Sequence, residues 1–294
     1  MTADTVRRGA TAAGFVAVLL WSSNAVLTTA NASIPALQLL TLVFAIAGTA
    51  GCAWLLRPGG EGVAALRMPV AAAVLTVAAL AGNYVLYFIA LKRAPVVAAN
   101  LINYLWPLFI VVFAAAFARV RVRPLQWLGT VLGLSAAVLL ILQGQRVRWD
   151  PAHAVGYAAA FGTALMWAAY SVLNRRHAGV PSTALFGAFV MVAALGGAAH
   201  LAFESWVAPT PLQWAAITAM GLGPTGLAFA LWDRATKHGD LAVLGTLSYA
   251  APVLSTGWLL LFGRAAPHWT QAVAVGLLLL GAWLSVRGGS TPES

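Results

Sequence analysis

Charged side chains are so widely spaced along this chain that most of it lies in long uncharged stretches. Residues 9–56 contain no Lys, Arg, Asp or Glu. Eight further stretches cover residues 68–91, 94–118, 124–145, 151–174, 177–203, 205–232, 241–263 and 265–286. An apolar helix needs about 20 residues to cross the hydrocarbon core of a bilayer, so each of the eight allows one crossing. Their continuous apolar character is typical of membrane helices rather than of barrel strands, in which apolar and polar residues alternate.

The first stretch is long enough for two crossings, and residues 31–35 (NASIP) form a turn-favouring cluster near its middle. The sequence therefore predicts ten membrane-spanning helices. Composition agrees, because 61% of the 294 residues are hydrophobic and only 8% are charged, against about 25% charged in an ordinary soluble domain. A water-soluble protein of this size could not cover its surface with so few charges. A cleaved signal peptide is disfavoured, since the internal repeat described below includes the first helix.

The basic residues predict the orientation of the helices, because Lys and Arg are enriched in cytoplasmic loops. If the N-terminus is cytoplasmic, all but five of the 17 basic residues face the cytoplasm, the exceptions being Lys92, Arg93, Arg146, Arg148 and Arg264. Both termini are therefore predicted to be cytoplasmic, with tails at residues 1–10 and 288–294. The net charge of +10 does not indicate nucleic-acid binding, because the basic residues lie singly or in pairs between apolar runs.

The two halves of the chain resemble each other. Residues 84–90 (YVLYFIA) parallel residues 229–235 (FALWDRA), and residues 103–107 (NYLWP) parallel residues 248–252 (SYAAP), in both cases at an offset of 145. The first helix carries a tryptophan and an asparagine three residues apart, and the sixth carries a tryptophan and a tyrosine at the same spacing. The fifth and tenth helices both carry glycine pairs, Gly129/Gly133 and Gly276/Gly281, which could form a dimer seam or pack within one monomer.

Five helices in each half place the halves in opposite orientations, because an odd number of crossings leaves the chain on the other side of the membrane. The expected repeats are residues 11–145 and 146–287. The predicted fold class is an all-α integral membrane protein of ten transmembrane helices, an inverted repeat of two five-helix halves. Inverted repeats are common in secondary transporters, in which the substrate site lies near mid-membrane between the halves.

Three features carry a resemblance to a known family. They are the paired halves, the Tyr/Trp-x-x-Ala close of the third and eighth helices (YFIA and WDRA), and a central proline in the fourth and ninth helices. Over residues 11–287 the chain resembles the drug/metabolite transporter superfamily, and within it the two-repeat EamA-type exporters. The NYLWP pattern, together with Trp21 and Trp167, is most similar to the YddG-type aromatic amino-acid exporters. This resemblance implies a multi-pass protein of the cell (inner) membrane that exports aromatic and other neutral amino acids.

Prolines are expected to interrupt three of the helices. Pro107 and Pro252 lie at the middle of the fourth and ninth helices, and Pro224 lies in the eighth. A proline lacks an N–H and displaces the carbonyl four residues earlier from its hydrogen bond. Freed backbone at mid-membrane is tolerated only where it is buried in protein or faces a watery cavity. We expect these prolines to act as hinges or gates of a transport path, with ordinary packed kinks as the alternative.

Polar and aromatic side chains within the spans are the candidate substrate ligands. Amides can donate to a carboxylate and accept from an ammonium group, and deep tryptophan rings can stack on an aromatic substrate or hold a cation over their face. Interhelical hydrogen bonding and plain packing are the alternative roles. The predicted substrate-binding residues are Trp21, Asn24, Asn83, Tyr84, Tyr87, Asn100, Asn103, Tyr104, Trp106, Trp167, Tyr170, Ser248 and Tyr249.

All seven acidic residues fall in loops, tails or span ends, so the middle of the spans lacks a carboxylate. Proton-driven transporters often place one there, and we therefore expect facilitated diffusion of a net neutral solute by alternating access. One alternative is an exporter of lipophilic drugs or other metabolites, with proton coupling. Another is a non-transporting assembly factor or receptor.

An intramembrane enzyme is not expected, because the spans contain no zinc motif and no nucleophile–base arrangement. We expect no metal and no cofactor. The expected partners are a small neutral solute and the lipid bilayer, and a monomer is favoured.

Overall fold

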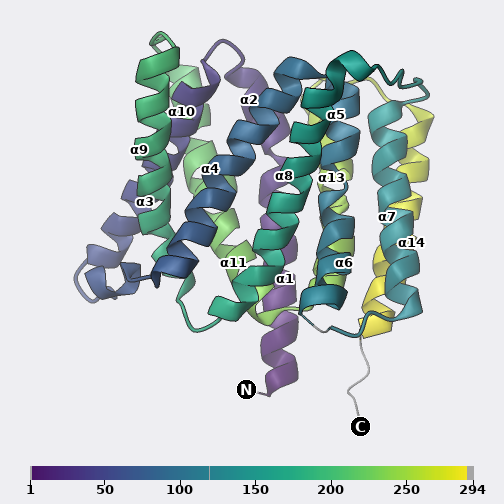
Figure 1. The fold of residues 1–294 in the computed structure, drawn as a ribbon, viewed down its shortest axis with the longest axis horizontal. Helices are drawn as coiled ribbons and strands as arrows, with labels where there is room; N and C mark the ends of the chain where they lie inside the picture. The colour runs from purple at the N-terminus through teal and green to yellow at the C-terminus, as the bar shows by residue number, and fades with distance from the viewer. Residues whose placement is uncertain (1, 119, 290–294) are drawn as a thin grey trace.

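The computed structural model describes residues 2–118 and 120–289, and all regular structure in this part of the chain is helical. Within the described residues, ten segments are long and apolar enough to cross a membrane, which confirms the number expected from the charge spacing. They stand side by side in one bundle (Figure 1). The first half comprises α1 Ala3–Ser22, α2 Asn24–Ala30, α3 Ala36–Leu56, η1 Val63–Leu66, α4 Val70–Arg93, α5 Val96–Asn103, α6 Trp106–Phe117 and α7 Pro124–Leu142. The second half comprises η2 Pro151–His153, α8 Ala154–Leu173, η3 Asn174–His177, η4 Ser182–Ala184, α9 Leu185–Phe203, α10 Pro211–Met220, η5 Gly221–Leu227, α11 Ala228–His238, α12 Leu241–Ser248, α13 Ala250–Leu261 and α14 Trp269–Gly289.

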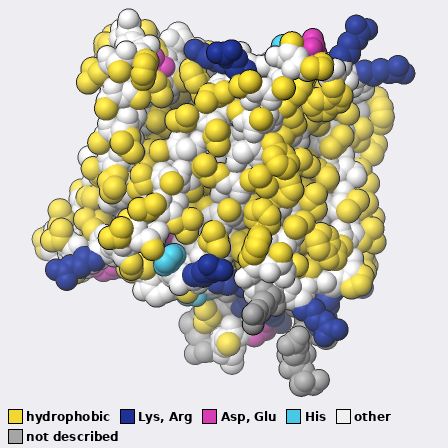
Figure 2. All heavy atoms as spheres, in the orientation of Figure 1, with side chains coloured by type: hydrophobic (Ala, Val, Ile, Leu, Met, Phe, Trp, Pro, Cys, Tyr) yellow, Lys and Arg dark blue, Asp and Glu magenta, His cyan; other side chains and the backbone are white. Residues whose placement is uncertain are grey.

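The start of α1 and the close of α14 lie at the same end of the bundle, which we call the termini end; the opposite end is the distal end (Figure 1). Between the two ends the visible face is covered by hydrophobic side chains, and basic side chains gather toward the ends (Figure 2). This is the distribution that a bilayer requires. Within the expected N-terminal tail, residues 3–10 are helical and form the first turns of α1, and Ala10 is fully buried. Of the expected C-terminal tail, residues 290–294 lie outside the described residues.

Three of the ten spans are each broken into two α-helices. α1 and α2 meet at Ser23, α5 and α6 are separated by Tyr104 and Leu105, and α12 and α13 meet at Tyr249. Pro107 is the second residue of α6, and Pro252 is the third residue of α13. Each proline therefore lies just past a break, as its missing N–H requires.

The eighth span is loosened in a different way. Its two α-helices, α10 and α11, are joined by the π-helical turn η5, which contains Pro224. π-turns inside α-helices are rare and are often found at functional sites. The structure thus has an irregularity at each of the three prolines singled out from the sequence; their hinge or gating role remains a prediction.

The two halves of the chain pack into each other. The closest helix pairs join one half to the other: α1 packs on α11, α4 on α8, α3 on α9 and α7 on α14. Glycines allow the last of these approaches. A Cβ built on Gly281 would lie 2.6 Å from the Gly129 carbonyl oxygen, and a Cβ on Gly129 would clash with the Gly281 carbonyl oxygen. These two glycines of the predicted pairs therefore pack within one monomer, as small residues do at membrane-helix interfaces.

Gly129→Ala is therefore expected to destabilise the protein by about 1–3 kcal/mol, since α7 and α14 must separate to admit the methyl group. Gly276→Ala on α14 is the matched control, because a Cβ there meets no atom within 4 Å and alanine is the better helix former by about 1 kcal/mol. Thermal unfolding in detergent should show a lowered midpoint for the first variant and an unchanged or raised one for the second. Equal midpoints for the two variants would contradict the close approach.

Glu204, at the distal end, joins α9 to the start of α3. It directly follows α9, and its carboxylate accepts hydrogen bonds from the backbone N–H groups of Leu37 and Gln38, each at 3.0 Å. His200 Nδ1 lies 3.0 Å from the same carboxylate. Partial burial alone would raise the pKa of the Glu204 carboxyl, but the hydrogen bonds from Leu37, His200 and Gln38 outweigh it and hold this pKa below its ordinary value of 4.5. Carboxylates are favoured at helix N-termini for the same reason.

This lowered pKa predicts a pH dependence of stability. The folded state binds fewer protons at Glu204 than the unfolded state does, so the stabilisation is present above pH 4.5 and is lost as the pH falls through the folded-state pKa. Glu204→Gln should remove this contribution. Unfolding midpoints measured from pH 7 to pH 3 should therefore converge for wild type and variant at the acid end. A difference that stays constant with pH would contradict a stabilising role for the bonds between the Glu204 carboxylate and the start of α3.

Candidate functional site

A cavity of about 260 Å³ lies beside the breaks in the first and fourth spans, between the two halves. Pockets for small molecules typically measure about 300–1,000 Å³, so this cavity suits a solute of amino-acid scale. Seven of its lining residues were predicted from the sequence, namely Trp21, Asn24, Asn83, Tyr84, Asn103, Trp106 and Trp167. Leu80 and Phe229 complete the lining. None of the nine is acidic or basic, so the walls carry no fixed charge.

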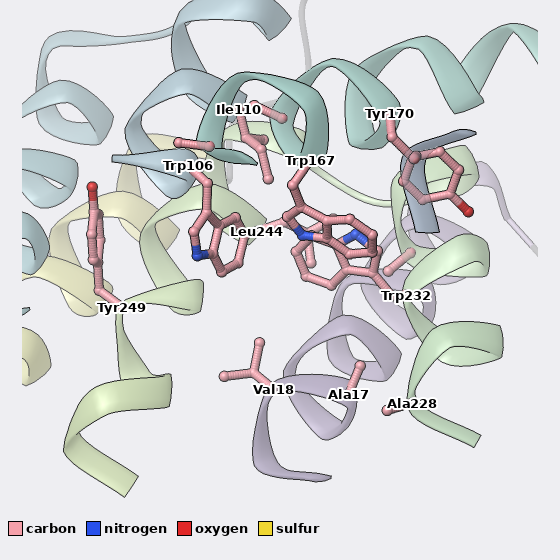
Figure 3. Close-up of a cluster of buried hydrophobic side chains, with 14 of the residues drawn as sticks. Ala17, Val18, Trp106, Ile110, Trp167, Tyr170, Ala228, Trp232, Leu244 and Tyr249 are labelled. Carbon is pink, nitrogen blue, oxygen red and sulfur yellow. The ribbon is translucent and has the colours of Figure 1, made fainter. Parts of the chain in front are cut away.

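Aromatic rings close the cavity on one side. The Trp21 ring lies at the centre of this aromatic cluster, with its centroid 5.7 Å from that of Trp167, 5.4 Å from Phe229 and 5.1 Å from Trp232. Trp106 meets Trp232 edge-on at 5.9 Å. Figure 3 shows Trp106, Trp167 and Trp232 converging from α6, α8 and α11. Edge-to-face rings at these distances are a favoured arrangement, so the cluster forms a rigid floor of the cavity.

The asparagines supply the polar surface of the cavity. Asn83 donates from Nδ2 to the Thr163 carbonyl oxygen at 3.3 Å, which leaves its Oδ1 as an acceptor. Asn24 Oδ1 is buried and has no hydrogen-bond partner among the described residues. An unpaired buried polar group costs about 1–3 kcal/mol, which a ligand or a water could offset.

The other predicted ligands lie around the cavity without lining it in this structure. The Tyr87 hydroxyl donates to Asn100 Oδ1 at 2.6 Å, and Tyr170 is buried with its ring 5.2 Å from that of Trp167. On α12, the Ser248 hydroxyl donates to the backbone carbonyl of residue 244. Tyr249 is fully buried, and Tyr104 lies in the break between α5 and α6. Their role in binding substrate stays a prediction.

Sequence reasoning missed Phe229 and Trp232, which contribute to the wall and the floor. Trp232 occupies the repeat position of Tyr87, and Phe229 that of Tyr84, and both of these tyrosines were singled out. The repeat could therefore have identified them. Leu80 gave no such signal, because a leucine in an apolar helix does not reveal which way it faces.

A buried ion pair lies beyond the aromatic floor, toward the termini end. Lys237 Nζ lies 2.8 Å from Asp233 Oδ2, and both side chains are no more than 3% exposed. Asn174 donates to Asp233 Oδ1 at 2.9 Å and Ser182 donates to Oδ2 at 2.5 Å. Lys237 also donates to the Val180 carbonyl oxygen at 2.8 Å. This Asp233–Lys237 network connects the closing turns of the sixth and eighth spans with the loop that precedes the seventh.

Asp233 lies near the close of the segment Pro211–His238, in keeping with the expectation that acidic residues occupy loops, tails or span ends. Its burial and its pairing with Lys237 were not expected from the sequence. The signal was an acid and a base four residues apart, which share one face of a helix.

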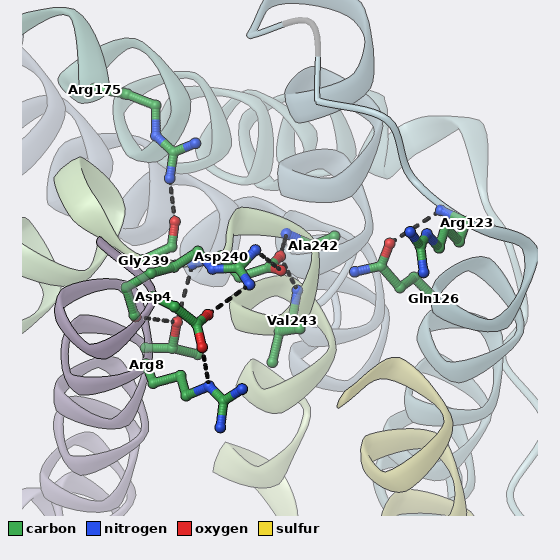
Figure 4. A network of polar contacts seen from close by, with 11 residues as sticks. Asp4, Arg8, Arg123, Gln126, Arg175, Gly239, Asp240, Ala242 and Val243 are labelled. Atoms are coloured by element: carbon green, nitrogen blue, oxygen red, sulfur yellow. Dashed lines mark hydrogen bonds and ion pairs between the residues drawn. The ribbon is translucent and has the colours of Figure 1, made fainter. Parts of the chain in front are cut away.

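A second set of polar contacts at the termini end ties α1 and η3 to the turn between α11 and α12 (Figure 4). The Arg175 guanidinium donates to the Gly239 and Thr236 carbonyl oxygens. The Asp240 N–H donates to the Thr11 hydroxyl at 3.0 Å, while Asp240 Oδ1 accepts from the first N–H groups of α12. Hydrogen bonds at the termini end thus join α1 and η3 to the turn between α11 and α12.

Comparison with known proteins shows the family. The family model of the EamA-like transporter family matches residues 8–142 and again residues 154–287. The chain belongs to the EamA-like transporter family. Together with the ten spans, the family match makes this a multi-pass inner-membrane protein.

Several relatives carry transporter names. The chain is 42% identical over 94% of its length to the aromatic amino acid exporter YddG of Ancylobacter novellus, of which 96% is covered. It is 25% identical over 97% of its length to the pseudopaline exporter CntI of Pseudomonas aeruginosa, of which 98% is covered. A solved crystal structure that is 41% identical matches with a TM-score of 0.90, covering 96% of this chain and 97% of its own. The resemblance inferred from the sequence is confirmed.

Proposed function

We propose that this EamA-like transporter exports aromatic and other neutral amino acids through the cavity between its halves. The observation that carries the proposal is the composition of the cavity wall, which combines indole and phenyl rings with asparagine amides and has no fixed charge. A zwitterionic amino acid has no net charge, and its carboxylate and ammonium groups can both bond to amides. Its aromatic side chain can pack against Trp21, Trp106 and Trp167.

The relatives support this substrate class. The 42% identical relative is named as an aromatic amino acid exporter, and so is a 26% identical relative from Escherichia coli K12. The pseudopaline exporter of Pseudomonas aeruginosa is named for a different cargo. Export of another small metabolite is therefore the second candidate function.

We infer an alternating-access mechanism in which the halves form an inverted repeat. Exchanging the halves of the chain would turn the α1–α11 pair into the α8–α4 pair, and would map α3–α9 and α7–α14 onto themselves. All four pairs are close contacts, which supports an approximate two-fold relation between the halves. In such an arrangement, one half can rock against the other so that the central site opens to one side of the membrane at a time.

The closed side of the proposed cycle is the termini end, which the basic residues assign to the cytoplasm. In the repeat, Asp233 and Lys237 correspond to Phe88 and Lys92 at the distal end. Lys237 is buried and paired with the carboxylate of Asp233. Lys92, in contrast, is exposed, and its ammonium group lies 4.4 Å from the centroid of the Phe88 ring. The aromatic floor and the ion pair both lie on the cytoplasmic side of the cavity. We therefore assign this conformation to an outward-facing state.

Counterflow in proteoliposomes tests the function. Vesicles preloaded with unlabelled tryptophan should take up labelled tryptophan faster than protein-free vesicles, and excess phenylalanine should compete. Because we expect facilitated diffusion, an imposed pH gradient should not drive net accumulation. Absence of tryptophan exchange would remove the proposed substrate class, while accumulation driven by the gradient would retain the substrate and replace the mechanism.

A further inference from the structure

A second and larger cavity lies at the termini end, on the side of α1 where Arg8 and Ala12 are exposed. It measures about 530 Å³ and shares no lining residue with the transport cavity. Helices α1, α12 and α14 form its walls, and we call it the termini-end groove. Its lining residues are Arg7, Arg8, Thr11, Ala12, Phe15, Asp240, Val243, Leu247 and Val286.

Polarity changes along the depth of the groove. Arg7 and Arg8 lie at its mouth, and Phe15 and Leu247 lie deeper in the bundle. Eight residues of α-helix separate Arg7 from Phe15, a rise of about 12 Å. A groove with charges at headgroup depth and apolar walls below matches an amphiphile standing in one leaflet. Basic pockets between transmembrane helices are known lipid headgroup sites.

The charges at the mouth are balanced rather than purely basic. Asp4 lies 3.0 Å from Arg7 and 2.8 Å from Arg8, and Asp240 lies 3.9 Å from Arg7. Two guanidinium groups therefore face two carboxylates. Arg8 is 72% exposed and Asp4 is 46% exposed, so both can reach a further ligand. This pattern complements a headgroup that itself carries one negative and one positive charge.

The corresponding position at the distal end carries an aromatic side chain. By the offset of 146 that relates Trp21 to Trp167, Thr11 corresponds to Tyr157. The Tyr157 ring lies 5.1 Å from the ring of Trp149 and 6.1 Å from that of His153. An aromatic side chain thus occupies this position at the distal end, whereas the termini-end groove has the smaller Thr11 there.

We propose that the termini-end groove binds one glycerophospholipid with a primary-ammonium headgroup, of the phosphatidylethanolamine type. Its phosphate accepts hydrogen bonds from Arg7 and Arg8, and its ammonium group donates to the carboxylates of Asp4 and Asp240. One acyl chain lies against Phe15 and the apolar residues of α12. The lipid thereby occupies the open space beside Thr11 and Ala12.

Native mass spectrometry of the whole protein, purified in mild detergent and exchanged into defined lipids, tests this site. With phosphatidylethanolamine, wild type should retain one lipid. Retention should fall at least fivefold with phosphatidylglycerol, which lacks the ammonium group, and with phosphatidylcholine, whose quaternary ammonium cannot donate. Arg7→Gln/Arg8→Gln should lower retention of phosphatidylethanolamine at least fivefold, and Asp4→Asn should reduce the preference for it over phosphatidylglycerol.

Two further variants keep the test independent of folding and charge. Arg67→Gln/Arg121→Gln removes two exposed arginines from the same end, outside the groove, and should leave retention unchanged. Ala12→Trp leaves all charges in place and fills the groove at an exposed position, so it should abolish retention in a folded protein. Equal retention of the three lipids, or unchanged retention in Ala12→Trp and in the Arg7/Arg8 double variant, would overturn the proposal.

Discussion

Asp233→Ala is expected to destabilise the protein by about 3–5 kcal/mol. The substitution leaves the Lys237 ammonium buried without a counter-charge, and breaking a buried ion pair by removing one partner costs about this much. Asn174 and Ser182 also lose the acceptor to which they donate. Thermal and denaturant-induced unfolding in detergent should show a large fall in stability for this single variant.

The double variant Asp233→Ala/Lys237→Met is the matched control. It removes both charges and keeps a long apolar side chain at position 237, and a buried ion pair replaced by apolar residues is often close to neutral in stability. Most of the lost stability should therefore return. A single variant that costs less than about 1 kcal/mol, or a double variant as unstable as the single one, would contradict the buried pair.

The same variants test whether the ion pair holds the termini end closed. Ser171 is fully buried and accepts a hydrogen bond from the Trp232 indole, so it reports on the floor. In a Cys52→Ser background, Ser171→Cys should react slowly with a membrane-impermeant thiol reagent applied from the termini end. Adding the Asp233→Ala/Lys237→Met change, which retains stability, should speed the reaction. An unchanged reaction rate would show that the ion pair does not hold the termini end closed.

The spans could be predicted from sequence because bilayer thickness sets a minimum apolar length, and charges mark where each span stops. Breaks near Pro107 and Pro252 were predictable for a similar reason, since a missing N–H acts locally. The break at Ser23 was not predicted: Ser23 has an N–H and a helical backbone conformation, and its hydroxyl donates to the carbonyl oxygen three residues earlier. A hydroxyl can compete for the helix backbone in this way in any serine-containing helix.

The candidate site divides along similar lines. Tryptophans and asparagines deep in an apolar span stand out, and Trp21, Asn24 and Trp167 do line the cavity. Ser248 and Tyr249 stand out equally, but the side of α12 that faces the cavity depends on how the ninth span packs. Tyr249 packs against Gly133 of α7, where a Cβ would come within 2.5 Å of its ring. That glycine makes room for the tyrosine, and only the three-dimensional structure reveals the pairing.

The asymmetry between the halves explains how a repeat can favour one conformation. Related positions carry Lys92 and Lys237, but only Lys237 has a buried carboxylate, at Asp233. A protein with two perfectly equivalent halves would have no reason to prefer closure at either end. In the alternating-access cycle that we propose, this ion pair in one half alone would bias the equilibrium between the outward- and inward-facing states, and a bias of about 1.4 kcal/mol changes their ratio tenfold.

Trp167→Ala is expected to lower the apparent affinity for tryptophan in counterflow about tenfold. Trp167 lines the cavity, and an aromatic contact is worth about 0.5–1.5 kcal/mol beyond the burial of area; a tenfold change in affinity corresponds to 1.4 kcal/mol. Trp167→Phe should lose less, because it keeps a ring. Trp214→Ala is the matched control, since Trp214 is 40% exposed on α10 and does not line the cavity.

The decisive comparison for Trp167 is between substrates. Loss of a stacking partner should weaken tryptophan exchange more than exchange of a small neutral amino acid such as alanine, which offers no ring. General damage to the fold would lower both together, and would also lower the unfolding midpoint measured in detergent. If Trp167→Ala transports tryptophan as wild type does, or loses both substrates in equal proportion while remaining folded, Trp167 does not recognise the aromatic side chain and the assignment passes to Trp21 and Trp106, which line the same cavity.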